Sequence, residues 1–263
     1  MRKKIEILKK NRIYTAERPF IFEADVAARY AFAAAFCKNK SVLDVGSGLG
    51  QGAMFLADSG AKNVLGIDYD SDTVRHASAV NESSKVKFRC LEAIDIGKIK
   101  RKFDVVLAFE ILEHLEKDDV RKFVNLLSNS LAEGGILLLT TPNGAKTDYV
   151  LGKPYNPYHV HEYSGKELKK ILGERFKHVE IKGIRQDNQK CQRQQLKLEK
   201  SIMYKPIYFL GHFRVIRELS PYIPRHIKNL VTKENSLPTL TKDDFLLTSN
   251  LKNCPGLFVS ANN

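Results

Sequence analysis

The apolar residues of this chain fall into short runs that alternate with stretches of helical spacing. Each short run predicts a buried strand. The runs span residues 42–45, 63–68, 86–90, 103–109 and 136–141. The helical spacing, with apolar residues three or four positions apart, spans residues 23–37, 53–57, 73–81, 117–132 and 165–172. We expect Asp70 to cap the third helix, Gly134-Gly135 to end the fourth, and Ser164 with Glu167 to form a capping box for the last. Alternation of strands and helices predicts a doubly wound, mostly parallel α/β sheet.

A glycine-rich turn follows the first predicted strand. Gly46, Gly48, Gly50 and Gly52 stand at every second position, and helical spacing resumes after them. Glycine has no Cβ, so the backbone can approach a ligand closely. The next helix offers N–H groups without partners at its start. The unit therefore predicts a ligand-binding loop, although Gln51 occupies the third glycine position of the dinucleotide fingerprint G-x-G-x-x-G.

Acidic residues lie at or just after the ends of four predicted strands. They are Asp44, Asp68, Glu92 and Glu110. The carboxyl ends of parallel strands meet at one edge of the sheet, where ligands of this fold class bind. Asp68 follows the loop by about 20 residues, where an acid takes both ribose hydroxyls of a nucleoside cofactor. An acid there argues against a cofactor with a 2′-phosphate.

These motifs resemble those of the class I S-adenosylmethionine (SAM) dependent methyltransferases. The matching parts are the strand–acid–G-x-G-x-G–helix run at residues 41–56, Asp68 and the Glu92-Ala93 pair. In that family the loop cradles the amino-acid and ribose parts of SAM, and the residue matching Glu92 accepts from the adenine amino group. The resemblance implies SAM as the cofactor and S-adenosylhomocysteine (SAH) as the product. The cofactor-binding residues that it implies are Asp44, Gly46, Ser47, Gly48, Gly50, Asp68, Tyr69, Glu92, Ala93 and Phe109.

The same resemblance implies a seven-stranded sheet whose last strand is antiparallel. Residues 176–184 then form the sixth strand and residues 257–261 the seventh. Family members join these two strands by a short hairpin, whereas about 70 residues intervene here. We therefore expect four parts, which are an N-terminal basic tail and lid helix (1–37), the SAM-binding core (38–184), a basic, aromatic helical insertion or cap (185–255) and the final strand (256–263).

Two stretches resemble, more narrowly, the methyltransferase branch associated with surface-polysaccharide and glycosyltransferase systems. One is Glu17-Arg18 followed by Arg29-Tyr30, and the other is the loop NPYHVHEY at residues 156–163. In that branch the N-terminal segment lies over the cofactor site, which implies a lid containing Tyr14 and Arg18. A plain helix with an N-terminal staple explains the same segment without a lid.

Four side chains are predicted to be catalytic because they follow the fourth and fifth strands. They are Glu110, His114, His159 and His161. Methyl transfer is an in-line displacement that requires donor and acceptor to be aligned at roughly 3–3.5 Å. A hydroxyl acceptor also gains from a general base, and histidine suits that role near neutral pH. In the polysaccharide-type branch, His159 or Glu110 orients or deprotonates the acceptor. The expected function is O-methylation of a sugar, glycolipid or similar polar or lipid-linked small molecule, without a metal.

Two alternatives remain open. The string Glu110-x-x-Glu113-His114 with a later His161 resembles the metal site of the small-RNA 3′-terminal 2′-O-methyltransferases, in which a divalent cation binds both hydroxyls of a terminal ribose. Metal-free methyltransferases, including those of ubiquinone biosynthesis, also carry E-x-x-E-H, and a structural role explains each histidine equally well. The other alternative is a non-catalytic SAM-binding module that acts through its basic surface.

The net charge of +13 is concentrated in two segments. Residues 1–12 contain six Lys or Arg against one Glu, and residues 182–233 contain twelve against three acids, while the remainder is nearly neutral. The second segment also interleaves its basic residues with aromatic ones. This pattern favours an anionic partner, which is a membrane surface, a phosphorylated carrier or, less well, RNA. Solvated surface charge explains it equally well.

Cysteine usage and hydropathy indicate the cellular compartment in which we expect the protein. The four cysteines are scattered without a C-x-x-C pair, which predicts a reduced protein with no disulfide or metal–thiolate framework. The basic N-terminus lacks an apolar signal-peptide region, and no run approaches the roughly 18 apolar residues of a membrane span. We expect a cytoplasmic protein with peripheral contact at the inner face of the membrane.

Overall fold

The fold is described from a computed structural model. It describes residues 20–146, 149–150, 153–154, 156, 158–186, 245–252 and 254–263. The predicted basic tail and the predicted lid with Tyr14 and Arg18 lie outside the described residues, as does most of the predicted insertion at residues 185–255.

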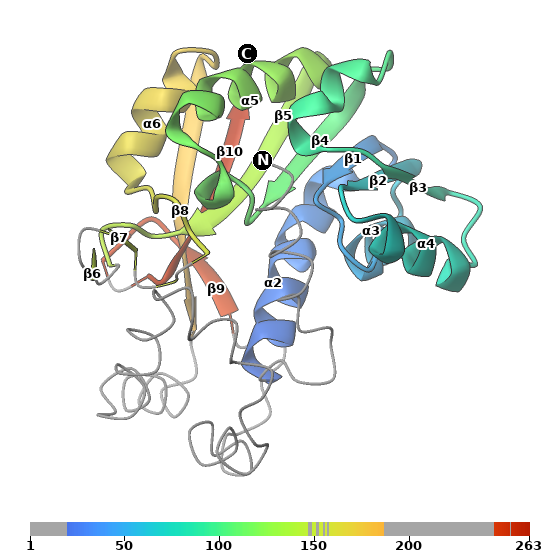
Figure 1. The fold of residues 1–263 in the computed structure, drawn as a ribbon, viewed down its shortest axis with the longest axis horizontal. Coiled ribbons are helices and arrows are strands. Elements are labelled where there is room, and N and C mark those ends of the chain that lie inside the picture. The colour runs from blue at the N-terminus through green and yellow to red at the C-terminus, as the bar shows by residue number, and fades with distance from the viewer. Residues whose placement is uncertain are drawn as a thin grey trace, which may run out of the picture.

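An eight-stranded, mostly parallel sheet forms the centre of the described chain (Figure 1). Its order is β3-β2-β1-β4-β5-β10-β8-β9. The parallel strands are β1 (Ser41–Val45), β2 (Asn63–Asp68), β3 (Val86–Cys90), β4 (Phe103–Phe109) and β5 (Leu131–Pro142). The remaining strands, β8 (His178–Gln186), β9 (Phe245–Thr248) and β10 (Gly256–Asn262), make antiparallel pairs with their neighbours, and β9 and β10 run opposite to the other strands. This arrangement confirms the predicted class I methyltransferase topology. Successive strands are added on one side of β1 up to β3 and then on its other side from β4 onward. Sheets of this kind bind ligands where the strand order reverses, which is here between β1 and β4.

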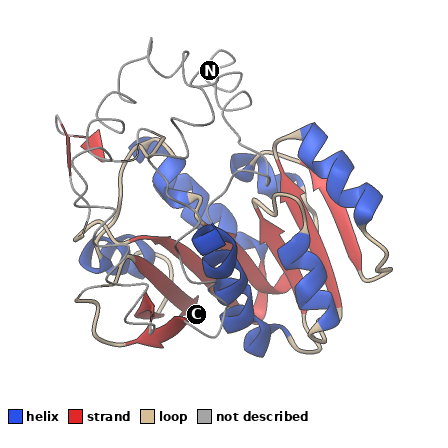
Figure 2. Ribbon diagram, turned by 90° about the horizontal axis from the view of Figure 1, so that it is seen from below, coloured by secondary structure: helices blue, strands red, loops and turns tan. Residues whose placement is uncertain are grey.

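Helices cover both faces of this sheet (Figure 2). The α-helices are α2 (Phe20–Cys37), α3 (Gln51–Asp58), α4 (Ser71–Val80), α5 (Lys117–Ser130) and α6 (Gly165–Gly173). The short elements are η1 (Ala93–Lys98), η2 (Leu112–His114) and the small ribbon of β6 (Tyr149–Val150) with β7 (Lys153–Pro154). Two apolar cores result, one beneath α5 and α6 and the other beneath α2 and α3. The capping box of Ser164 with Glu167 and the cap that Asp70 gives to α4 are confirmed.

The boundary between α5 and β5 differs from the prediction. We expected Gly134-Gly135 to end the helix, but α5 ends at Ser130 and β5 begins at Leu131. The two glycines lie where the register with β4 shifts between Phe103 and Val105. A Cβ on Gly135 would approach three backbone oxygens at 2.9–3.1 Å. The glycine pair therefore permits a bulge inside a strand instead of terminating the helix.

An eighth strand lies within the segment that we assigned wholly to the insertion. Strand β9 pairs with β8 through four residues, from Gly183↔Thr248 to Gln186↔Phe245. The prediction treated this short apolar run as part of the cap because its partner strand is about 60 residues away in the sequence. Its pairing covers the outer edge of β8, which would otherwise present unpaired backbone groups.

Helix α2 packs directly on the start of α3 through Tyr30. A Cβ on Gly52 would lie 2.0 Å from the Tyr30 ring, so this position accommodates only glycine without displacing the ring. The same ring meets Phe109 edge to face, with 5.3 Å between centroids. The contact fixes α2 against the helix that follows the glycine-rich loop. None of the helices in the described ranges is long and apolar enough to cross a membrane.

We expect Gly52→Ala to lower the free energy of unfolding by about 1–3 kcal/mol, because the added methyl overpacks the Tyr30 contact. Gly173→Ala is the matched control, since no atom lies within 4 Å of its added Cβ. Chemical denaturation measures both variants. Equal stabilities for the two variants would show that Tyr30 does not pack on α3 in this way.

Candidate functional site

The glycine-rich turn forms an open loop between β1 and α3. Gly46, Gly48 and Gly50 have φ values of 74°, 56° and 81°, which side-chain-bearing residues rarely adopt. The N–H groups of Gly46 and Ser47 donate to the carbonyl of Ile67 at 2.8 and 2.9 Å, which ties the loop to β2. No atom lies within 4 Å of a Cβ built on Gly48. The loop is thus held at its base and open at its centre.

Asp68 holds this loop from the end of β2. Its carboxylate accepts from the N–H of Gly48 and from the N–H of Asp70, each at 3.0 Å, and the residue is buried. A carboxylate has about four lone-pair sites, so a group of this kind can accept several hydrogen bonds at once. The predicted ribose role is compatible with this position and stays a prediction.

Asp44 is buried under the loop and is bonded to α2. The Tyr30 hydroxyl donates to Oδ2 of Asp44 at 3.0 Å. Burial raises the pKa of Asp44 to about 7, the Tyr30 bond opposes that rise, and the nearby Asp68 adds to it. Burial, and then the nearby Asp44 charge, raise the pKa of Tyr30 well above its ordinary value, so its hydroxyl remains the donor.

The other predicted cofactor residues follow the ends of neighbouring strands. Ser47 is buried and its Oγ has no hydrogen-bond partner. Glu92 is exposed at the position before η1, and Ala93 begins that element. Tyr69 follows β2, and its carbonyl accepts from the Cys90 thiol. The Phe109 ring instead packs in the α2 core against Tyr30 and Phe258.

These residues fit the predicted cofactor. The loop leaves open space above Gly48, Ser47 offers an unpaired buried hydroxyl, and Asp68 stands at the carboxyl end of the next strand. A nucleoside needs acceptors for its ribose hydroxyls, and the N-terminus of α3 supplies N–H donors that no side chain caps. The arrangement therefore suits the ribose and amino-acid parts of SAM.

A second group of polar residues follows β4 and lies against the loop. Ile111 contacts Gly46 so closely that a Cβ there would lie 2.9 Å from its Cδ1. Glu110, just before it, has a φ of 53°, and its N–H donates to the carbonyl of Thr140 at 2.9 Å. A left-handed conformation at a residue other than glycine is costly and concentrates at functional sites. The chain after β4 is thus turned sharply beside the loop.

Helix α2 brings a buried cation to this group. The Arg29 Nη2 atom lies 2.5 Å from Asp25 Oδ2 and 3.5 Å from Glu110 Oε2. Glu113 is fully buried, and its Oε2 accepts from the Thr141 hydroxyl at 3.0 Å. Burial, and then the nearby Glu110 charge, raise the pKa of Glu113 well above its ordinary value. Arg29 opposes that rise, so the three groups act on one another.

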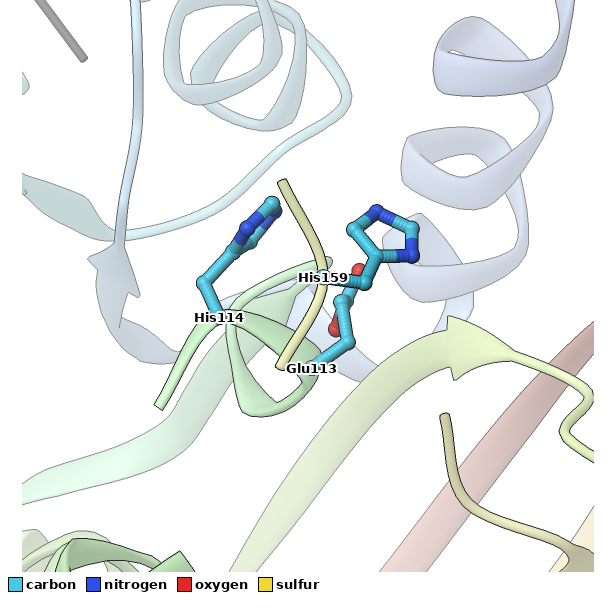
Figure 3. A group of neighbouring side chains, drawn as sticks. All are labelled: Glu113, His114 and His159. Atoms are coloured by element: carbon cyan, nitrogen blue, oxygen red, sulfur yellow. The ribbon is translucent and has the colours of Figure 1, made fainter. Parts of the chain in front are cut away.

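The loop before α6 places His159 beside Glu113 and His114 (Figure 3). One potential ligand atom from each of these three residues lies within 4.8 Å of the others. The Nδ1 atom of His159 is 2.5 Å from Glu162 Oε1, and its Nε2 atom is 2.9 Å from the Asn156 amide nitrogen. The carboxylate only accepts and the amide nitrogen only donates, so we assign the proton to Nδ1. His159 is therefore held in one tautomer.

Backbone contacts hold this loop on η2. The Val160 N–H donates to the carbonyl of Glu113 at 2.7 Å, and the His114 Nδ1 lies 3.1 Å from the carbonyl of Tyr158. The His114 and His159 rings meet edge to face, with centroids 4.9 Å apart. Residues far apart in the sequence thus form one site at the carboxyl ends of β4 and β5.

His161 lies on the other side of the loop. Its Nε2 is 3.1 Å from Glu167 Oε1, and its ring packs on Tyr163. It lines a separate cavity of about 200 Å³ with residues of α5 and α6. The structure therefore groups His159, and not His161, with Glu113 and His114.

Three residues of the site were not assigned a role from the sequence. Arg29 was used only in recognising the resemblance to the polysaccharide-type branch, and Glu162 and Asn156 were named only as part of the loop motif. Glu162 was identifiable, because it stands three residues after His159 in a segment too short to separate them. Arg29 was not, because its contact with Glu110 joins distant parts of the chain.

Comparison with known proteins identifies the family to which the chain belongs. A profile of the methyltransferase domain family matches residues 18–176, so the chain belongs to that family. A probable S-adenosylmethionine-dependent methyltransferase from Mycolicibacterium smegmatis is 35% identical over 136 residues, which cover 52% of this chain and 51% of that protein. A ubiquinone biosynthesis O-methyltransferase from Rickettsia canadensis is 33% identical over 131 residues, which cover 47% of this chain and 54% of that protein. The chain thus spans about half the length of these curated relatives.

Solved structures show the same fold at low sequence identity. A SAM-dependent methyltransferase from Archaeoglobus fulgidus gives a TM-score of 0.58 at 18% identity, covering 93% of this chain and 99% of that one. The [4+2]-cyclase SpnF gives a TM-score of 0.56 at 17% identity, covering 91% and 81%. A cyclase thus shares the fold, so the chemistry has to be argued from the site.

We expect Asp68→Asn to weaken the binding of SAM and SAH by about tenfold or more, because an amide replaces an anionic acceptor that also holds Gly48. Isothermal titration with SAH measures the effect. Asp58→Asn, at the exposed end of α3, is the matched control and should bind like the wild type. Unchanged affinity in Asp68→Asn would remove Asp68 from the cofactor site.

Asp44 should make the stability of the ligand-free protein depend on pH. Its pKa is raised from 3.8 to about 7 in the folded state, so the folded protein holds a proton that the unfolded chain has lost between those values. Stability should therefore fall as the pH rises through this range, by at most about 1.4 kcal/mol per pH unit. Denaturation of the wild type and Asp44→Asn across the range checks this, and parallel pH profiles would contradict it.

Proposed function

We propose that the protein is a SAM-dependent methyltransferase that moves a methyl group to a hydroxyl oxygen of a sugar, glycolipid or similar polar small molecule. The observation that carries this is the close contact between the glycine-rich loop and the segment after β4, made by Ile111 on Gly46. It sets a buried polar cluster beside the predicted cofactor loop. Membership of the methyltransferase domain family supports the reaction class.

Bound SAM supplies an electrophilic methyl group on a sulfonium. The protein's own work is to hold the cofactor and acceptor aligned and to manage one proton. The loop and Asp68 bind the cofactor, and the segment at residues 110–114, in which Glu113 is buried, orients the acceptor. Because this segment and the loop touch through Ile111 and Gly46, the two parts keep a fixed relative position, which alignment requires.

His159 is the group best placed to accept the proton of the acceptor hydroxyl. Glu162 fixes its Nδ1–H, which leaves Nε2 as the basic nitrogen. In the ligand-free structure Nε2 accepts from Asn156. An acceptor hydroxyl replaces that donor with its own O–H, after which Nε2 takes the proton as the oxygen is methylated. Buried Glu162 stabilises the imidazolium that forms.

The choice of an oxygen acceptor has independent support. Several relatives are named ubiquinone biosynthesis O-methyltransferases. The loop at residues 156–163 resembles that of the polysaccharide-type branch, which favours a sugar or glycolipid. The basic segments at residues 1–12 and 182–233 would bring a cytoplasmic enzyme to an anionic membrane surface that presents a lipid-linked acceptor.

A second candidate is a metal-dependent RNA 3′-terminal 2′-O-methyltransferase. The observation that favours it is the grouping of Glu113, His114 and His159, which offers one carboxylate and two imidazoles to a divalent cation. Such a cation would hold the two hydroxyls of a terminal ribose. The expected ligand set from the sequence contained His161, so this candidate now depends on His159 in its place. A third candidate is a module that binds SAM without transferring its methyl group.

Methyl-labelled SAM and a lysate of the source cells separate these candidates. Label in glycan, lipid or small-molecule fractions that is insensitive to EDTA supports the proposed function. Label in RNA that EDTA abolishes supports the metal-dependent candidate. Binding of SAM without label in any fraction supports the non-catalytic module.

We expect His159→Gln to slow methyl transfer by about 10²–10⁴-fold with little change in SAH affinity, because it removes the general base and leaves the cofactor loop intact. His161→Gln is the matched control and should retain most of the activity, because its side chain faces the other cavity. Initial rates with the fraction that the wild type labels measure both. A wild-type rate in His159→Gln would exclude His159 from the mechanism.

A further inference from the structure

Three neighbouring residues of the site each have a buried side-chain atom without a hydrogen-bond partner. Among the described residues, these atoms are the Nε of Arg29, the Oε1 of Glu110 and the Oε1 of Glu113. Arg29 is about nine-tenths buried and Glu113 is completely buried. Unsatisfied buried polar atoms are rare in proteins, because each costs roughly 1–3 kcal/mol. Three together therefore indicate a place that a polar ligand completes.

The three residues belong to one cluster. Arg29 Nη2 lies 3.5 Å from Glu110 Oε2, and the charges of Glu110 and Glu113 both act on Arg29. The second oxygen of Glu113 is already used by Thr141, and Arg29 Nη2 by Asp25. The buried atoms left without partners are the Nε–H donor of Arg29 and one carboxylate oxygen from each glutamate. The cluster thus offers a mixed set of hydrogen-bonding atoms.

The chemistry of this set restricts the ligand. A simple cation satisfies the two carboxylate oxygens but gives the Arg29 N–H nothing to donate to. A simple anion satisfies Arg29 and is repelled by the glutamates. A hydroxyl both donates and accepts, so two neighbouring hydroxyls satisfy all three atoms. They do so even when Glu113 carries a proton.

We propose that Arg29, Glu110 and Glu113 form a subsite for a pair of adjacent hydroxyls, so that the acceptor is a polyol or sugar with a vicinal diol. This proposal rests on the proposed methyl-transfer function, whose acceptor class it narrows. The Ile111 contact with Gly46 places the subsite beside the cofactor loop, where the acceptor must lie. The pair anchors the acceptor, and a further hydroxyl of the same molecule donates to His159 and is the methylated oxygen.

Simple ring alcohols test the subsite without knowledge of the natural acceptor. The probes are cis-1,2-cyclohexanediol, myo-inositol and cyclohexanol, which share a six-membered ring and differ in their hydroxyls. Binding to the SAH-loaded full chain is measured by ligand-observed NMR titration, and Mg²⁺ is titrated separately by calorimetry. We expect the diol and inositol to bind at least about tenfold more tightly than cyclohexanol, because the second hydroxyl adds hydrogen bonds to charged groups.

Two conservative variants assign this preference to the cluster. Arg29→Lys keeps the charge and removes the Nε donor, and Glu113→Gln keeps the shape and removes an anionic oxygen. Both should lose the preference for the diol while retaining SAH affinity. The matched controls are Arg121→Lys and Glu174→Gln, which alter an exposed pair of the same type and should keep it. Retained SAH affinity shows that a variant is folded.

Each outcome decides the proposal. Equal binding of diol and cyclohexanol by the wild type, or no binding of either, overturns it, and so does a diol preference that survives in both cluster variants. Tight Mg²⁺ binding that Glu113→Gln abolishes, without diol binding, identifies a cation site instead. A wild type that labels a cell fraction but ignores the diol refutes this inference alone. A wild type that prefers the diol but transfers no methyl group refutes the proposed function alone.

Discussion

Burial of carboxylates at the ends of parallel strands is the constraint on which this site depends. Such groups are costly to bury unless they have partners. Two consecutive residues of α2 supply the partners, since Tyr30 donates to Asp44 near the end of β1 and Arg29 pairs with Glu110 just after β4. One helix thereby stabilises both the predicted cofactor side and the proposed acceptor side. The contact of Tyr30 with Gly52 holds that helix in position, so Tyr30 both packs the helix on α3 and supplies a hydrogen bond to buried Asp44.

The sequence predicts the fold well because the fold is encoded locally. Strands such as residues 103–109 and the cap at Ser164 depend on neighbours within a few positions, and both are found where expected. The errors arise where a local pattern has two solutions. Gly134-Gly135 is equally suited to ending a helix and to forming a bulge, and only the pairing of β5 with β4 decides. Strand β9 is too short to recognise without its partner β8.

The site is predictable only in part, for the same reason. The loop and Asp68 form a motif with fixed spacing, so the sequence predicts a cofactor side there. The acceptor side brings together α2, the segment after β4 and the loop before α6, which no spacing links. His159 and His161 are two residues apart, and the sequence alone gives no reason to prefer one of them. In the structure the His159 ring bonds to Glu162, whereas the His161 ring bonds to Glu167. The path of the loop in three dimensions distinguishes the two histidines, because their residue type is the same.

Strand β9 has one more consequence, which concerns the evolution of the chain. Gln186 and Phe245 are paired across two adjacent strands, so the segment between them leaves and rejoins the sheet at points about 5 Å apart. A loop closed at such a base costs little more as it lengthens, because closure entropy grows only with the logarithm of length. Residues 187–244 are thus an insertion between two paired residues of adjacent strands. Their length can therefore change at little cost, while the pairing of β8 with β9 and the rest of the sheet stay unchanged.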